Sequence, residues 1–175
     1  MVSTMNWSSH SLIALACILI LTSCGQTTEP SVPPTNAFAL DGDGFQNLNL
    51  AMPTVYVPVL VDTSKRTNEF LMGTEVPSTK DSIFLLIRFP GRTPGAFAWG
   101  GGKLDVTYTK LTLKRKSGQR VEYIPFPNNP QGTTVITQYD STGIRGTFTG
   151  ELANSSNGTV RVQIKNGIFQ ARLQK

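Results

Sequence analysis

The chain has little of the chemistry on which many enzymes depend. Its one histidine, His10, and its two cysteines, Cys17 and Cys24, all lie near the start of the 175-residue sequence. The residues after Cys24 therefore hold no Cys–His or Ser–His couple for nucleophilic catalysis and no Cys or His ligand for zinc. They form no disulfide, because they contain no thiol. We expect a non-enzymatic protein with no cofactor and no metal site.

Charged side chains are missing from the start of the chain. Residues 1–23 contain no Lys, Arg, Asp or Glu, so the formal net charge of +5 belongs to the remainder. A basic domain is attracted to an anionic bilayer or to lipopolysaccharide. The alternative, which we favour, is that this moderate charge only keeps the domain soluble.

The N-terminal region ends in a recognisable order of residues. An apolar run over residues 12–21 leads into Leu21-Thr22-Ser23-Cys24, and the chain then becomes polar. The run is shorter than the ~20 residues that span a bilayer and has the length of a signal-peptide core. The order resembles a bacterial lipobox, in which the cysteine thiol receives a diacylglyceryl group and the peptide is cut before it. The alternatives are an ordinary secretory signal with an incidental cysteine and a retained transmembrane helix.

Lipidation of Cys24 would make the membrane a partner of the protein. One acyl chain gives only reversible binding, whereas the two or three chains of a lipidated cysteine hold firmly. Gly25 stands where an aspartate retains enterobacterial lipoproteins in the inner membrane, so we expect an outer membrane lipoprotein, periplasmic or surface-exposed. Nucleic acid is not an expected partner of an envelope protein.

Three parts follow from this organisation. Residues 1–23 are predicted to be the signal peptide, and residues 24–37 the acylated cysteine and a flexible tether that contains Pro30, Pro33 and Pro34. Residues 38–175 form one domain. Its apolar pattern alternates as in strands, and no stretch sustains a helical period. Around nine strands joined by short turns predict an all-β fold, an antiparallel β-sandwich or meander barrel.

Several local patterns give sharper expectations. Residues 54–61 predict a strand in which Pro58 indicates an edge position or a bulge. The nearly continuous apolar run of residues 82–89 predicts a strand covered on both faces. Asp41-Gly42-Asp43-Gly44 predicts a turn, because the further ligands of a calcium loop are missing. Residues 154–158 predict a hairpin loop, and Asn166-Gly167 predicts a second hairpin turn of type I′.

Five blocks of the domain resemble a known group of proteins. They are residues 83–87 (IFLLI), 95–97 (GAF), 132–140 (GTTVITQYD), 144–152 (IRGTFTGEL) and 162–169 (VQIKNGIF). Their order is similar to that of small secreted lipoproteins of the Bacteroidota that carry a C-terminal all-β domain of unknown function. The resemblance implies the location and the fold of residues 38–173, and no activity.

Trp99 and Tyr108 are the candidate ligand-binding aromatics. Trp99 stands before Gly100-Gly101-Gly102, and an aromatic face on a mobile loop could stack on a sugar ring. A carbohydrate-binding accessory protein is therefore one alternative function. The other interpretation, which we favour, makes Trp99 a core or rim residue at a bulge and places Tyr108 in the core.

A basic cluster surrounds Ser117-Gly118 and is expected at a hairpin tip. It consists of Lys110, Lys114, Arg115, Lys116 and Arg120. Such a tip could bind phosphate groups or an acidic partner, although charged tips are usually only solvated. A third function, a hydrolase, would need two facing carboxylates, and the acids Asp41, Asp43, Asp62, Asp105, Glu122 and Glu151 are scattered. We expect a lipid-anchored envelope module that binds a glycan or another envelope protein, or has a structural role.

Overall fold

The structure, a computed structural model, describes residues 36–52, 54–56, 67–101 and 107–171. Cys24, the signal peptide and residues 24–35 of the expected tether lie outside these ranges. The described ranges contain eleven strands and no helix, which confirms the all-β fold. They accordingly include no helix with the length and apolar character that crossing a membrane requires.

The strands in the described part of the chain are antiparallel in every pair. In chain order they are β1 (Ala37–Gly42), β2 (Phe45–Ala51), β3 (Thr54–Tyr56), β4 (Thr67–Glu75), β5 (Ser82–Pro90), β6 (Gly95–Ala98), β7 (Tyr108–Lys114), β8 (Arg120–Ile124), β9 (Gln131–Asp140), β10 (Gly143–Asn154) and β11 (Arg161–Ala171). Their order in the sheet is β2-β1-β11-β10-β8-β7-β5-β4-β3, while β9 pairs with β10 and β6. β3, which covers the first three residues of the stretch 54–61, lies at an edge, while Pro58 lies outside the described residues.

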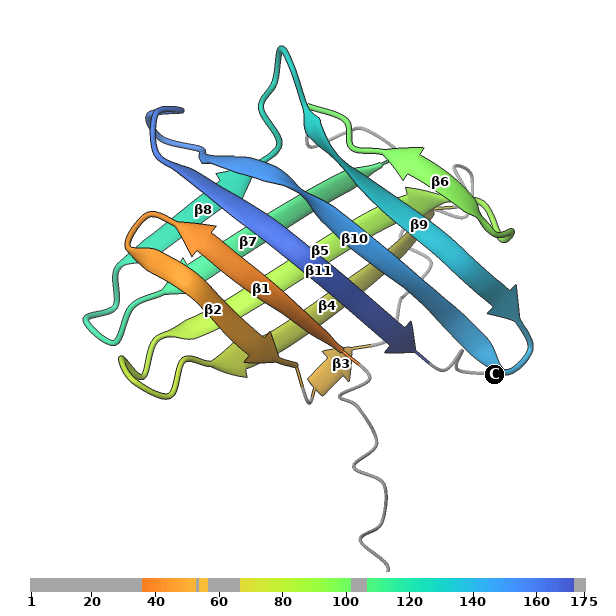
Figure 1. Ribbon diagram of the computed structural model, residues 1–175, viewed down its shortest axis with the longest axis horizontal. Coiled ribbons are helices and arrows are strands. Elements are labelled where there is room, and N and C mark those ends of the chain that lie inside the picture. Colours follow the sequence, from red (N-terminus) through yellow and green to blue (C-terminus); the bar gives the residue numbers. More distant parts are fainter. Residues whose placement is uncertain (1–35, 53, 57–66, 102–106, 172–175) are drawn as a thin grey trace, which may run out of the picture. The chain divides into compact units, whose positions relative to one another are not determined.

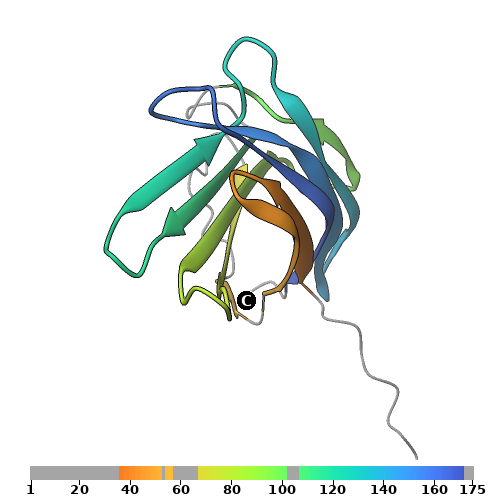
Figure 2. The ribbon, with the colours of Figure 1, turned by 60° about the vertical axis from the view of Figure 1, so that its left-hand side comes forward.

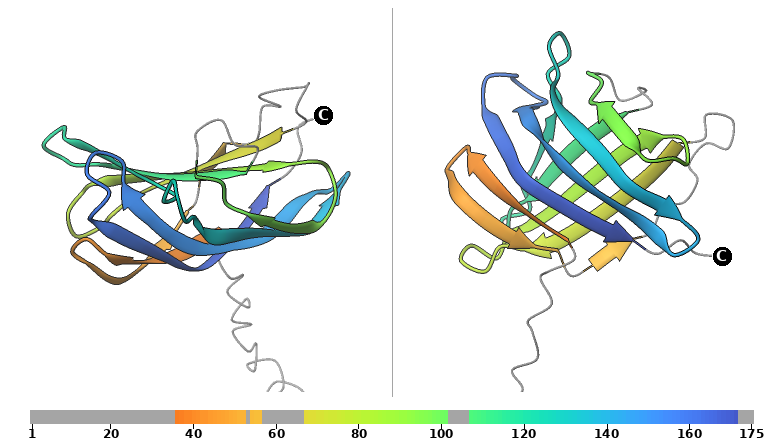
Figure 3. Two further views of the ribbon diagram at one scale, coloured as in Figure 1. Left: turned by 90° about the horizontal axis from the view of Figure 1, so that it is seen from above. Right: turned by 45° about the vertical axis from the view of Figure 1, so that its right-hand side comes forward.

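Strand β10 changes neighbour along its length and so folds the sheet into two layers. From Gly143 to Glu151 it pairs with β9, and at Ala153 and Asn154 it pairs with β8. One layer is β6-β9-β10-β11-β1-β2 and the other is β8-β7-β5-β4-β3. Figure 1 shows the strands of the two layers crossing, Figure 2 shows the curl of the sheet, and the left view of Figure 3 shows one layer above the other.

Apolar side chains from both layers meet in one core. Phe70 of β4 packs against Phe169 of β11, with ring centroids 5.0 Å apart. Phe70 also stacks on Phe89 of β5 at 5.5 Å. Burying each such side chain stabilises the fold by roughly 1.5–3 kcal/mol, so the contact between layers holds the sheet in its folded shape.

Strand β5 is covered on one face only, which corrects the expectation drawn from its apolar run. Ile83, Leu85, Ile87 and Phe89 are buried in the core, while the residues between them are half-buried. The strand therefore alternates like the other strands of an antiparallel sheet. Two of its outward side chains, Phe84 and Leu86, are apolar as well, and this made the run nearly continuous.

The type I′ turn predicted at Asn166-Gly167 is wrong, because both residues lie inside β11. Asn166 has a positive φ of 52° and forms a bulge that puts one extra residue into β11 against both β10 and β1. Phe148 of β10 lies across Gly167, where a Cβ would come within 2.5 Å of the ring. A two-residue hairpin turn with positive φ at both positions does occur between β1 and β2. It is formed by Asp43-Gly44, with φ of 49° and 83°.

We predict that Thr109→Val stabilises the protein. Thr109 of β7 is 0% exposed, and its hydroxyl has no hydrogen-bond partner among the described residues. Valine keeps the shape and removes a buried hydroxyl that costs about 1–3 kcal/mol when unpaired. The free energy of unfolding, measured in urea, should rise by about 1 kcal/mol.

Thr134→Val is the matched control. Thr134 is equally buried, but its hydroxyl accepts a hydrogen bond from the indole nitrogen of Trp99 at 2.9 Å. The same substitution should therefore lower stability at this position. A loss of stability in both variants would contradict the assignment of Thr109 as an unpaired hydroxyl.

Candidate functional site

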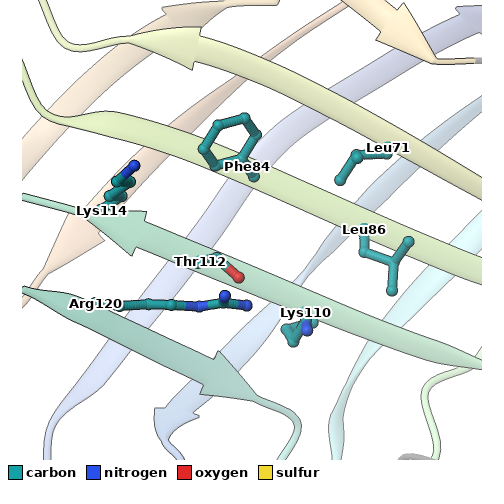
Figure 4. A pocket seen from close by; sticks show the side chains of 7 residues that line it. All are labelled: Leu71, Phe84, Leu86, Lys110, Thr112, Lys114 and Arg120. Carbon is teal, nitrogen blue, oxygen red and sulfur yellow. The ribbon is translucent and has the colours of Figure 1, made fainter. Parts of the chain in front are cut away.

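The outer faces of β4, β5, β7 and β8 form a hollow of about 320 Å³, which we call the groove (Figure 4). Its lining consists of Leu71, Phe84, Leu86, Lys110, Thr112, Lys114 and Arg120. All seven side chains lie on the face of this layer that is turned away from the core. The groove combines apolar and cationic groups, which the rest of this subsection takes in turn.

The floor of the groove is apolar because of strand alternation and register. Burial of the odd-numbered side chains of β5 turns Phe84 and Leu86 outward. Leu86 lies opposite Leu71 of β4, and Phe84 lies opposite Gly73. A Cβ on Gly73 would come within 3.0 Å of the Phe84 ring, so the glycine allows the ring to lie close to the sheet. Leu71, Phe84 and Leu86 remain half-buried rather than covered.

The cations of the groove come from the β7–β8 hairpin. Lys110 lies opposite Leu86, and Lys114 lies opposite Arg120. Glu122 accepts hydrogen bonds from Arg120 Nη2 at 2.7 Å and from Lys110 Nζ at 3.4 Å. Lys114 has no ionic partner among the described residues. Two of the three cations thus share one carboxylate and the third has none, so this end of the groove has an excess of positive charge.

The ionisation of Glu122 reflects this arrangement. Burial by itself raises the pKa of the carboxyl, but the hydrogen bond from Arg120 and the charge and hydrogen bond of Lys110 outweigh it. The pKa of Glu122 is therefore below its ordinary value. The carboxylate stays charged at neutral pH and holds two of the cations beside the apolar floor.

The groove is polarised across the strands. The apolar side chains stand on β4 and β5, and the three cations stand on β7 and β8 (Figure 4). Thr112, which lies opposite Phe84, adds a hydroxyl at the boundary. A ligand in this groove meets hydrocarbon on one side and ammonium or guanidinium groups on the other.

The structure divides the predicted basic cluster between two places. Lys110, Lys114 and Arg120 line the groove, whereas Arg115 and Lys116 belong to the hairpin turn and bind Asp81. The Asp81 carboxylate accepts from the Lys116 backbone N–H at 2.9 Å and from Arg115 Nη1 at 3.0 Å. The hydrogen bond from Lys116 is the largest cause of the lowered pKa of Asp81, and it outweighs burial, which raises that pKa. Arg115 therefore anchors the hairpin.

Trp99 is a core residue, which agrees with the interpretation that we favoured, and the alternative of an exposed aromatic platform for a sugar is wrong. Its side chain is 2% exposed and donates a hydrogen bond to Thr134. The ring lies over Gly132 and Gly150, where any Cβ would collide with it. The three glycines that follow Trp99 suggested a mobile loop. Instead, the indole packs against the backbone of β9 and β10 at positions that lack a side chain.

Tyr108 lies on the same outer face as the groove but does not line it. The side chain is 3% exposed, and Arg88 lies 5.9 Å from the centre of its ring. Burial and the nearby charge of Glu122 raise the pKa of Tyr108 to about 12, against a smaller opposite effect of Arg88. The tyrosine therefore supports the sheet beside the groove and does not contact a ligand there.

Sequence reasoning missed the apolar half of the groove. The signal was present in residues 82–89, where apolar side chains occupy both parities of one strand. That run also fits a strand that another layer covers on both sides, and no local feature separates the two cases. Leu71, Phe84 and Leu86 form the floor of a groove because no other described layer covers the outer face of β4 and β5.

Other features of the described surface offer less chemistry. A hollow of about 420 Å³ over β9, β10 and β11 has no charged side chain in its lining. Asp41 pairs with Lys165, Glu69 with Arg88 and Glu151 with Arg161. The described ranges contain no group of three or more His, Cys, Asp or Glu that could hold a metal ion. Asp62 and Asp105 lie outside those ranges.

Comparison with family models, with curated proteins and with solved structures finds no match to this chain. The chemistry of the groove is therefore the basis for assigning a function.

We predict that Arg120→Gln raises the pKa of Glu122. A lowered folded pKa contributes stability that is present above the unfolded carboxyl pKa of about 4.3 and is lost as the pH falls. Removing the Arg120 hydrogen bond should shrink this acid-sensitive part of the stability. An NMR titration of the Glu122 carboxyl carbon checks the shift, and Lys116→Gln should leave it unchanged. A Glu122 titration identical in Arg120→Gln and the parent protein would contradict the pairing.

Proposed function

We propose that the protein is a lipid-anchored, non-enzymatic binding module of the bacterial cell envelope, and that the groove is its binding surface. The observation that carries this proposal is the pair of apolar side chains, Phe84 and Leu86, on the outer face of β5. An antiparallel sheet with one solvated face ordinarily places polar side chains on that face. Here Phe84 and Leu86 point outward into a hollow that no other described element fills.

The apolar floor is more than scattered surface hydrophobicity. Leu71, Phe84 and Leu86 are neighbours on two paired strands, so their exposed areas are contiguous. Contiguous apolar patches bordered by polar groups mark ligand or partner sites. The three cations beside this patch supply the few oriented polar groups that binding pockets combine with an apolar lining.

The N-terminal sequence supports the anchor. Cys24 stands at the end of a lipobox-like order, and the two or three acyl chains that it would carry are enough for stable attachment. Gly25 favours the outer membrane, and the resemblance to Bacteroidota lipoproteins agrees with this location. A membrane-tethered domain would present the groove within the envelope.

A role in binding rather than catalysis is supported by how the charged groups are engaged. Glu122 holds Lys110 and Arg120, and Asp81 holds the hairpin turn through Arg115. Neither the groove nor the hollow near Phe126, with its single carboxylate Glu151, places two acids in one lining. The groups that face the groove are suited to attracting an anion.

We predict that Cys24→Ala releases the protein from the membrane fraction. Loss of the thiol removes the acyl chains that hold the protein, at about 0.8 kcal/mol for each buried methylene. Cell fractionation and incorporation of labelled palmitate measure the effect. Cys17→Ala is the matched control and should stay membrane-bound and labelled. If the Cys24→Ala protein sediments with membranes as firmly as the parent protein, the anchor is not at this residue.

We also predict that the groove binds the neutral apolar dye Nile red. Phe84→Ala removes the largest side chain of the floor and should weaken dye binding about fivefold or more, which corresponds to ~1 kcal/mol of lost apolar contact. Fluorescence titration gives the affinities. Ile168→Ala is the control, because Ile168 is 37% exposed on the other layer. Equal dye binding by the parent protein and Phe84→Ala would remove the groove as the binding surface.

A further inference from the structure

On the basis of the proposed function, we infer that the ligand of the groove is a single-chain amphiphile with an anionic head group. Its hydrocarbon chain lies over Leu71, Phe84 and Leu86, and its head group lies between Lys114 and Arg120. The inference names the class of ligand, which the proposed function leaves open. Four properties of the groove lead to it.

First, the groove holds its ligand through side chains alone. It lies over β5 and β7, and each of these strands pairs with a neighbour on both sides: β4 and β7 flank β5, and β5 and β8 flank β7. Their backbone N–H and C=O groups are used within the sheet. A peptide that binds by adding a strand needs a free sheet edge, which β5 and β7, the two strands beneath the middle of the groove, do not offer. The occupant is therefore a molecule that does not depend on backbone pairing.

Second, the polar groups of the groove select an anion. Its lining contains the donors Lys110, Lys114 and Arg120 and the hydroxyl of Thr112, and it contains no carboxylate. Lysine and arginine donate hydrogen bonds and cannot accept them. A carboxylate, phosphate or sulfate matches such a set, because its oxygens only accept. The head group is thus acidic.

Third, the charges are not all neutralised within the protein. Glu122 pairs with Lys110 and Arg120, while Lys114 has no ionic partner among the described residues. These three cations and one carboxylate leave a net charge of two positive units at one end of the groove. A bound monoanion or dianion compensates this excess at the position of Lys114.

Fourth, the dimensions suit one chain. The distance from β4 to β8 covers three strand spacings, or roughly 14 Å, and runs from the apolar to the cationic side. The volume of about 320 Å³ is at the lower end of the range for small-molecule sites. The floor residues are half-buried within the hollow. A hollow of this size accommodates one amphiphile.

A head-group series tests the inference. The full chain with Cys24→Ser, which removes the acyl graft, is titrated with monomeric dodecanoate, dodecyl maltoside, dodecyltrimethylammonium and butanoate. Amide shifts of β5 and β7 in NMR spectra report binding. We expect dodecanoate to bind about fivefold or more tightly than the neutral maltoside, and the cationic amphiphile and short butanoate to bind far more weakly. The preference for dodecanoate should decrease with added salt.

Variants separate the head-group contact from the floor. Lys114→Gln should weaken dodecanoate binding about threefold to fivefold and leave Nile red binding unchanged. Lys116→Gln, another exposed lysine of the same hairpin, is the matched control and should alter neither. Leu86→Ser serves beside Phe84→Ala as a second floor variant, and the thermal unfolding of each variant shows that it is folded.

Each outcome has a defined meaning. Equal binding of dodecanoate and dodecyl maltoside overturns the anionic head group, while Nile red binding that depends on Phe84 keeps the groove as a binding surface. Absence of any binding that depends on Phe84 overturns the proposed function as well. Capture of the Cys24→Ser chain by phosphatidylglycerol vesicles, without binding of monomeric dodecanoate, replaces the single amphiphile with a bilayer and overturns the inference.

Discussion

The burial of one face of β5 is the constraint on which the rest of the structure depends. Ile83, Leu85, Ile87 and Phe89 fill the space between the two layers, and the strand cannot shift by one residue without taking all four out of the core. The residues between them must then point away from the core. The outward position of Phe84 and Leu86 is therefore a consequence of packing on the opposite side of the same strand.

The same register determines what surrounds these two side chains. β4 and β7 pair with β5 residue by residue, so Leu71 and Lys110 flank Leu86, and Gly73 and Thr112 flank Phe84. The β7–β8 hairpin adds Arg120 beside Lys114. Core packing and groove chemistry are thus linked, because both follow from one set of strand pairings. Besides Lys114, four of the seven lining residues stand on β5 and β7, which pair with a neighbour on both sides: Phe84, Leu86, Lys110 and Thr112.

Two dipeptides show that local sequence does not by itself determine whether a turn forms. Asp43-Gly44 and Asn166-Gly167 have the same turn chemistry, and both contain a non-glycine residue with positive φ. The first ends a strand, because β1 and β2 pair directly with each other. The second only bulges β11, because this strand continues between β1 and β10 and Phe148 packs on Gly167. Neighbouring strands, and not the dipeptide, account for the difference. Trp99 likewise precedes three glycines, a pattern typical of a loop, but its ring packs over the backbone of Gly132 and Gly150.

The sequence by itself determined the all-β class, most of the strand positions and the clustering of lysine and arginine around one hairpin. These properties depend on residues that are close along the chain, such as alternating side chains and turn dipeptides. The tertiary structure decided which face of each strand is buried and that the Trp99 ring packs over Gly132 and Gly150. It also decided that Leu71, Phe84 and Leu86 join three of the cations in one groove. Those outcomes depend on pairing between strands far apart in sequence, and a strand carries the same alternation whichever neighbour covers it.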